Sequence, residues 1–220
     1  MDENNYERPD YVEQEPAPKK TAGNFFAKVF SRKYLPATIA VLAGAVILIV
    51  LIACLFSYLG PKSVAERYLS AYIYDNHSTL AKLSAYDYKE YLMRNYDDEE
   101  EYFEAMSDDL DEDITSWSQF SKICVANRKE DIEDEYGKYK LTFDATRVKD
   151  LSAKKLESEL GGYTLNLLED YDFDIDDYDG GKVVTVKVKL TGEDDNEKET
   201  AEVILVRSGL TWKVVDCSFD

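Results

Sequence analysis

The stretch "KVVTVKVKLTGEDDNEKETAEVILVRSGLTWKVVDCSF", residues 182–219, decides the fold. It holds three runs in which valine, isoleucine, leucine and threonine alternate with polar residues, which is the pattern of half-buried β-strands. Two short turns, "GEDDNE" at 192–197 and "RSG" at 207–209, separate the three runs. Connections this short join antiparallel neighbours, so the stretch predicts a three-stranded antiparallel meander.

Two upstream segments are also interpreted as strands. In "GKYKLTFDATRV", residues 137–148, apolar side chains alternate with polar ones. We interpret "SKICVANRKEDI", residues 121–132, as its partner across a turn at 134–137. The segment "SAKKLESEL", residues 152–160, predicts a short helix that ends at the following glycine pair. The C-terminal half of the chain is therefore expected to form an antiparallel sheet.

Helical periodicity dominates the region before these strands. "PKSVAERYLSAYIYDN", residues 61–76, has an apolar stripe at helical spacing, and Ser63 and Glu66 have the spacing of a capping box. Three shorter helices are expected at residues 77–85, 86–96 and 97–110. Helices followed by an antiparallel sheet predict an α+β domain with the helices on one face of the sheet.

A long uncharged segment precedes this domain. "YLPATIAVLAGAVILIVLIACLFSYLGP", residues 34–61, carries no charge. A helix over residues 36–59 would be roughly 36 Å long, which exceeds the hydrocarbon thickness of about 30 Å. The segment therefore predicts one transmembrane helix at residues 34–60.

The flanks of this segment predict its orientation and the domain boundaries. Lysines and arginines precede it without acids from residue 18 to 35, so the N-terminus is expected in the cytoplasm. We expect a disordered cytoplasmic tail with a basic end at residues 1–33 and an extracytoplasmic domain at residues 61–220. An uncleaved signal anchor fits the long apolar run. Lipidation of Cys54, within "LIAC", is the open alternative.

The net charge of −19 lies entirely on the C-terminal domain, because acids and bases cancel in residues 1–33. A surface with this charge repels phosphate, which argues against nucleic acid as a partner. The expected partners are the lipid bilayer and an unidentified envelope protein or ligand.

The order of elements resembles the nuclear transport factor two-like, or α+β cone, domains, including several membrane-anchored envelope proteins of Gram-positive bacteria. The resemblance rests on the opening helix "SVAERYLSAYIYD", residues 63–75, and the closing strand "TWKVVDCSF", residues 211–219. It implies a cone of helices on a curved antiparallel sheet, which can enclose a pocket. Some relatives are enzymes, such as ketosteroid isomerase, and others bind or scaffold. Tyr68 and Tyr72 are the residues that could line such a pocket.

The sequence contains no recognisable catalytic motif. The single histidine, His77, is interpreted as a solvated or capping residue between helices. Cys124 and Cys217 fall on the first and last predicted strands, where they form either a disulfide or two buried free thiols, depending on the distance between their Cα atoms. No Ser/His/Asp set, phosphate loop or zinc spacing is visible, and no cofactor is expected.

The acidic segment "EDYDFDIDDYDGG", residues 169–181, invites a calcium hypothesis. The calcium loop of an EF-hand needs glycine at its sixth position and glutamate at its twelfth, where this chain has Asp177 and Val183. We interpret the segment as extended, with Phe173 and its apolar neighbours turned inward, and a weak nonspecific cation site is the open alternative. The sequence thus favours a non-catalytic binding or sensing domain behind a membrane anchor. The alternative is a small-ligand-binding protein or pocket enzyme on the same fold.

Overall fold

The computed structural model describes residues 43–50, 59–193 and 195–219. The chain divides into two compact units, residues 1–52 and 53–220. In the first unit, residues 43–50 are helical and exposed. Within the described ranges, no helix combines the length and the apolar character that crossing a membrane requires. The predicted tail, most of the predicted membrane helix and Cys54 lie outside the described residues.

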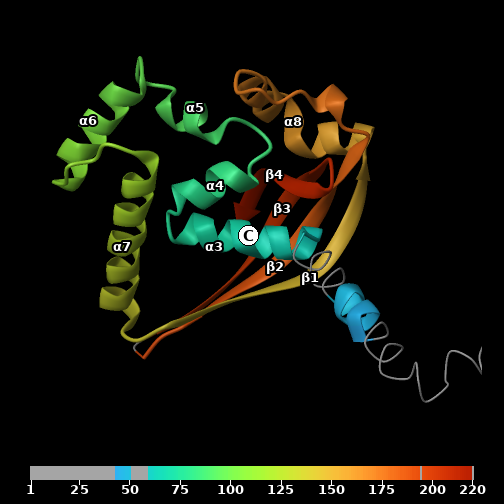
Figure 1. The fold of residues 1–220 in the computed structure, drawn as a ribbon, viewed down its shortest axis with the longest axis horizontal. Helices are drawn as coiled ribbons and strands as arrows, with labels where there is room; N and C mark the ends of the chain where they lie inside the picture. Colours follow the sequence, from blue (N-terminus) through green and yellow to red (C-terminus); the bar gives the residue numbers. More distant parts are fainter. Residues whose placement is uncertain (1–42, 51–58, 194, 220) are drawn as a thin grey trace, which may run out of the picture. The chain divides into compact units, whose positions relative to one another are not determined.

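Residues 59–219 form an α+β domain (Figure 1). The first helices confirm the predicted ones. The helices are α3 (Pro61–Ile73), α4 (His77–Leu83), α5 (Tyr88–Met93), α6 (Glu99–Leu110), α7 (Trp117–Tyr136) and α8 (Ala153–Glu169), with a 3-10 helix at Ile175–Asp177. The strands are β1 (Lys140–Ser152), β2 (Gly180–Thr191), β3 (Asn196–Ser208) and β4 (Thr211–Phe219).

The four strands form one antiparallel sheet in the order β1-β2-β3-β4. This confirms the predicted meander of β2, β3 and β4. β1 pairs with β2 although α8 and the 3-10 helix lie between them in the chain. The register of β1 slips between Ala145 and Arg147, which is a bulge on the edge of the sheet.

One face of the sheet is covered by α3 and α4. The predicted stripe of α3 is buried, with Tyr68 and Leu69 packed against Val184, Val186 and Val203 of the strands. α3 contacts all four strands, and Figure 1 shows it lying across them. Removal of this apolar surface from water stabilises the domain by about 25 cal/mol per Å².

The opposite face is covered at one end by α8, so the prediction that helices occupy a single face is wrong. Leu156 and Leu160 of α8 pack against Val183, Ile204 and Val206. The reason lies in the strands: "VV" in β2 and "VILV" in β3 place apolar side chains on both faces at this end. Both faces therefore need a cover there.

Residues 121–132 were predicted as a strand and lie instead within helix α7. Ser116 caps this helix, because its hydroxyl accepts a hydrogen bond of 3.3 Å from the backbone N–H of Gln119. The buried residues Trp117 and Phe120 lie three positions apart, at helical spacing. Helix α7 ends at Gly137, whose φ of 67° ordinarily requires glycine.

Two further local predictions are corrected by the structure. The predicted capping box of α3 does not form, since Gly60 is the N-cap and Pro61 opens the helix. Residues 170–179 are not extended, because α8 continues past a kink at Gly161 and is followed by turns and the 3-10 helix. Phe173 nevertheless points inward, with 2% of its surface exposed, as the alternation indicated.

Candidate functional site

A pocket of about 500 Å³ opens between α3, α7 and one end of the sheet. Its walls are the C-terminal end of α3 and the second half of α7, and the strands provide the floor. Leu141, Val188 and Leu190 make this floor apolar. A volume of this size is typical of sites for small molecules.

Carboxylates surround the apolar floor. Asp75 follows α3, Asp131 and Glu135 lie on α7, and Glu197 and Glu199 lie on β3. Of the residues that the structure describes, Arg128 is the single basic one that lines the pocket. Five carboxylates against one guanidinium give the pocket a strongly negative potential, which low-dielectric walls focus.

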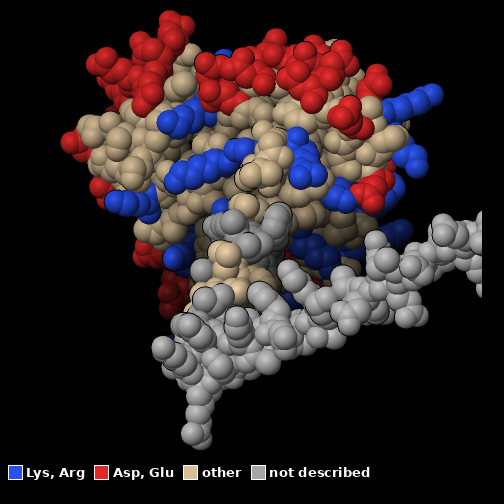
Figure 2. Space-filling model, turned by 45° about the vertical axis from the view of Figure 1, so that its right-hand side comes forward, with Lys and Arg blue, Asp and Glu red and all other residues tan. Residues whose placement is uncertain are grey.

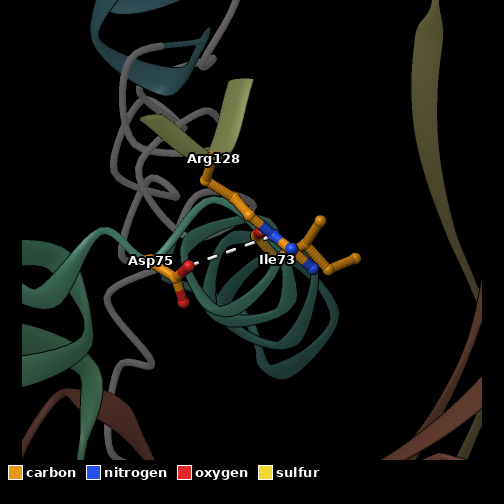
Figure 3. A network of polar contacts seen from close by, with 3 residues as sticks. All are labelled: Ile73, Asp75 and Arg128. Atoms are coloured by element: carbon orange, nitrogen blue, oxygen red, sulfur yellow. Dashed lines mark hydrogen bonds and ion pairs between the residues drawn. The ribbon is translucent and has the colours of Figure 1, made fainter. Parts of the chain in front are cut away.

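Arg128 is engaged at the end of α3 (Figure 3). Its Nε donates a hydrogen bond of 3.2 Å to the backbone carbonyl of Ile73 and lies 3.9 Å from the carboxylate of Asp75. The guanidinium thus binds a carbonyl that the helix end leaves unpaired. Burial raises the pKa of Asp75, the ion pair with Arg128 lowers it, and repulsion by Asp131 raises it again. Among the described residues, none of the other four carboxylates takes part in an ion pair.

The left-handed backbone of Asp75 places this carboxylate beside the pocket. Its φ is 52°, a region that aspartate tolerates better than most residues. The following residue, Asn76, donates its backbone N–H to Ala71 and accepts one from Thr79 with its side chain. The chain therefore turns from α3 into α4 with Asp75 held at the bend.

Aromatic rings complete the wall nearest to α3. The rings of Tyr72 and Phe219 lie 5.8 Å apart, and both residues line the pocket. About half of the surface of Tyr72 is exposed, at 49%. The faces of such rings attract cations. The pocket therefore combines an apolar floor, aromatic walls and excess carboxylates.

The far end of the pocket is held by the turn between β2 and β3. The backbone N–H of Glu193 donates a hydrogen bond of 2.8 Å to the carbonyl of Tyr136, the last residue of α7. Gly192 packs so closely against Tyr136 that an added Cβ would lie 2.7 Å from the Cβ of this tyrosine. These contacts fix the end of α7 against the sheet.

The two tyrosines expected at a pocket have different positions. Tyr72 lines the pocket, as described above. Tyr68 is buried, with 5% of its surface exposed, and belongs to the core beneath α3. Burial raises the pKa of Tyr68, and the neighbouring Tyr86 adds to the rise.

His77 is a packed residue at the start of α4, where Asn76 is the N-cap, so the interpretation of His77 as a solvated or capping residue between helices is wrong. Its Nδ1 lies 3.0 Å from the hydroxyl of Tyr88, and its ring stacks on Phe120 at 4.8 Å. Burial lowers the pKa of His77 to about 4. It is not among the residues that line the pocket between α3 and α7.

The two cysteines of the domain are free thiols on different elements. Cys124 lies on α7 and Cys217 on β4, and both are partly buried. Burial raises the pKa of Cys124 to about 11 and that of Cys217 to about 12. Neither residue lines the pocket described above.

Sequence reasoning missed the acidic part of the pocket. In "NEKETAE", Glu197 and Glu199 fall on the strand face that carries Ala201 and Val203, both buried beneath α3. An acid at a position where the period predicts an apolar side chain was the available signal. The acids on α7 could not be placed at the pocket from the sequence, because residues 121–132 were interpreted as a strand.

Charge is segregated over the domain surface. In Figure 2, acidic side chains gather along the top of the face shown, and lysine and arginine side chains lie below this band. In the described residues, no group of three or more His, Cys, Asp or Glu side chains is arranged to hold a metal ion. Comparison of the chain with protein-family models, with curated proteins and with solved structures finds no match.

Proposed function

We propose that this chain is a membrane-anchored binding protein whose domain takes a cationic ligand with an apolar part into the pocket between α3 and α7. The observation that carries the proposal is the lining of the pocket, in which five carboxylates and one arginine surround an apolar floor. An ammonium or guanidinium group would replace the repulsion among these carboxylates with attraction, while the apolar part of the ligand would cover the floor.

The chemical class of the ligand follows from the side chains that line the pocket. Tyr72 and Phe219 offer ring faces to a cation, at roughly 0.5–2 kcal/mol per contact. Small inorganic cations gain little from an apolar floor, so the ligand is an organic cation. Arylalkyl amines and the basic side chains of a peptide both belong to this class.

The anchor is supported by the sequence. Residues 34–61 contain no charge, and the basic residues before them favour an N-terminus in the cytoplasm. The domain would then lie outside the cytoplasm and close to the bilayer, because α3 begins at Pro61. The resemblance to α+β cone domains agrees with this arrangement, and it adds the proposal that the sheet and helices form such a cone around the pocket.

Calorimetry with the full chain in micelles tests the pocket. Phenethylamine, protonated at neutral pH, is the probe, and 2-phenylethanol is its neutral counterpart. We expect the amine to bind and the alcohol to bind at least about tenfold more weakly, because the carboxylates contribute only to the charged probe. Equal affinities for the two compounds would contradict a site for cations.

A pair of variants on one strand locates the site. Glu199→Gln removes a carboxylate that lines the pocket, and Glu202→Gln removes one that lies on the opposite face of β3. Both change the net charge equally. We expect only Glu199→Gln to weaken binding of the amine, by roughly threefold to tenfold. Equal effects of the two substitutions would move the ligand out of this pocket.

Membrane vesicles of known sidedness test the anchor. A protease added outside right-side-out vesicles is expected to digest residues 61–219 and to leave the segment before residue 34 intact. Digestion of neither region, or release of the intact chain by high salt, would contradict an anchored external domain.

The second candidate function is a pocket enzyme, and one observation favours it. Asp75 lines the pocket and has a raised pKa, as catalytic carboxylic acids often do. Binding remains the first proposal because Asp75 is about half exposed and lies in an ion pair with Arg128. If Asp75→Asn leaves the affinity for the amine nearly unchanged but abolishes turnover of a candidate substrate, the enzyme is favoured instead.

A further inference from the structure

The sheet face opposite the pocket carries a patch of basic residues. Side chains alternate between faces along a strand, so those that share the face of Val183 and Ile204 point away from α3. Beyond the end that α8 covers, Asp144 and Glu202 are the acids of this face. Its five basic residues, called the basic face below, are Lys140, Arg147, Lys187, Lys189 and Lys198.

This patch opposes the charge of the whole chain. Five basic and two acidic side chains leave a local excess of positive charge, whereas the chain has a net charge of −19. Strand β3 shows how the separation arises, since Glu197 and Glu199 face the pocket and Lys198 faces the other way. The expectation that the acidic surface of this domain repels phosphate therefore does not extend to the basic face.

Lys189 and Lys198 are directly opposite each other in the pairing of β2 with β3. The Cβ atoms of such pairs lie about 5 Å apart, and like charges there destabilise a sheet. Lys187 adds a third ammonium two residues along β2, and all three side chains are exposed. None of the ion pairs among the described residues includes these lysines. An anion bound between them would remove the repulsion.

Neighbouring side chains indicate phosphate. Threonine hydroxyls that can donate to phosphate oxygens lie among the lysines at Thr185 and Thr200, whereas the hydroxyl of Thr142 already donates a hydrogen bond of 3.3 Å to the backbone carbonyl of Lys189. The paired rows of this face hold no aromatic side chain, so they offer no platform on which bases could stack. A ligand with repeating phosphate groups and without bases fits these rows.

The borders of the basic face indicate a linear ligand. On one side α8 stands on the sheet, and a helix is about 10 Å thick. On the other side, the turn between β2 and β3 carries Glu193 and Asp195. A flat bilayer would meet the helix and the acidic turn. A polymer can lie between them, across the strands.

We propose that the basic face binds a linear polymer of repeating phosphate groups, which lies across β3, β2 and β1. Lys187, Lys189 and Lys198 form the centre of the contact. The interaction is electrostatic and multivalent, so its strength falls steeply as salt displaces the polymer. The pocket on the other face takes no part in it, and the inference holds whether or not the pocket binds a cation.

The test uses the full chain in zwitterionic micelles and fluorescently labelled long-chain inorganic polyphosphate as the probe. Anisotropy is expected to show binding that weakens with rising salt. The triple variant Lys187→Gln, Lys189→Gln, Lys198→Gln is expected to have an affinity for the probe that is lower by at least roughly tenfold. Failure of the wild-type chain to bind near physiological ionic strength would overturn the proposal.

A matched triple variant tests specificity. Lys82→Gln, Lys122→Gln and Lys154→Gln remove the same number of charges from exposed positions on α4, α7 and α8. We expect this variant to lose less than about twofold in affinity, since its lysines lie outside the basic face. Equal losses in both variants would show attraction without a site. The variant that lacks Lys187, Lys189 and Lys198 is expected to be at least as heat-stable as the wild type, because it removes an opposed lysine pair. The single variant Lys198→Gln tests the same loss of binding with a smaller change of charge.

Competition distinguishes the sources of phosphate. Orthophosphate at millimolar concentration is expected to leave polyphosphate binding intact, because one anion contacts few of the lysines. Complete competition would show a site for a single phosphate and overturn the polymer. If doping the micelles with phosphatidylglycerol displaces the probe from the wild type, the partner is the bilayer surface and the proposal fails.

Discussion

Glu66 and Ala145 connect the first helix of the domain to the bulge of its edge strand. The Oε1 atom of Glu66 accepts a hydrogen bond of 2.9 Å from the backbone N–H of Ala145. Ala145 borders the position where β1 slips its register against β2. A residue that the sequence suggested as a local cap of α3 is thus a long-range contact between α3 and the sheet.

Replacement of Glu66 by alanine is expected to lower the free energy of unfolding by about 1–2 kcal/mol, because the Ala145 N–H loses its partner. Urea unfolding of the full chain in micelles, followed by tryptophan fluorescence, measures the change. Glu66→Gln keeps an acceptor and should recover most of the loss. Glu157→Ala, at an exposed position of α8, is the control, and an equal effect there would count against the contact.

The turn that holds the end of α7 predicts a difference between two glycines. An added Cβ at Gly192 would collide with the backbone and side chain of Tyr136, whereas at Gly162 no atom lies within 4 Å. Gly192→Ala is therefore expected to destabilise the domain by about 1–3 kcal/mol and to weaken binding in the pocket. Gly162→Ala should be neutral or stabilising by up to about 1 kcal/mol. Similar melting temperatures for both variants would contradict the tight packing at the turn.

The free thiols predict slow alkylation. At pH 8, burial keeps Cys217, with a pKa of about 12, and Cys124, with a pKa of about 11, almost wholly protonated. Labelling with iodoacetamide, followed by mass mapping of peptides, is expected to modify both sites slowly in the folded chain and quickly in urea. No reductant should be needed for either reaction. Labelling that requires reductant would reveal a disulfide between them.

The sheet could be predicted from the sequence because its signal is local. The alternation along residues 182–219 and the short turns between the runs determine three strands and their antiparallel order. The helix α3 was equally readable from its stripe, which includes Tyr68 and Leu69. In each case the apolar residues whose spacing predicts the element are also the residues that pack into the core.

The pocket could not be predicted because it depends on where α7 lies. Residues 121–132 hold apolar and polar residues in an order that fits either period, and only the cap at Ser116 and the stop at Gly137 define one long helix. Once α7 is a helix, Arg128 reaches the end of α3. The contact spans 55 residues of sequence, and no local pattern encodes it.

Replacement of Arg128 tests whether the ligand of the pocket carries a positive charge. Because Arg128 is the one basic residue that lines the pocket in the described part of the chain, Arg128→Gln would leave Asp75 without its ion pair and make the pocket more negative. We expect the affinity for phenethylamine to rise by about twofold to fivefold, measured by calorimetry. Lys129→Gln, on the next position of α7, is the control for net charge. A loss of affinity specific to Arg128→Gln would indicate that the arginine itself contacts the ligand.

His77 predicts how stability depends on pH. Its pKa is about 4 in the folded domain and about 6.5 in an unfolded chain, because the site between Tyr88 and Phe120 disfavours the charged ring. Between these values the unfolded state binds a proton that the folded state does not. The contribution of the neutral histidine is therefore complete above pH 6.5 and declines as pH falls toward 4, by up to about 3 kcal/mol.

The variant His77→Phe separates the contribution of His77 to the pH dependence of stability from that of the many carboxylates, which titrate in both proteins. Phenylalanine keeps a ring against Phe120 and has no proton to bind. We expect the free energy of unfolding of the wild type, relative to the variant, to fall between about pH 7 and pH 4.5, as measured by urea unfolding at each pH. A difference between the two proteins that stays constant over this range would show that His77 is solvated in the folded chain, because a histidine with an ordinary pKa contributes no pH dependence.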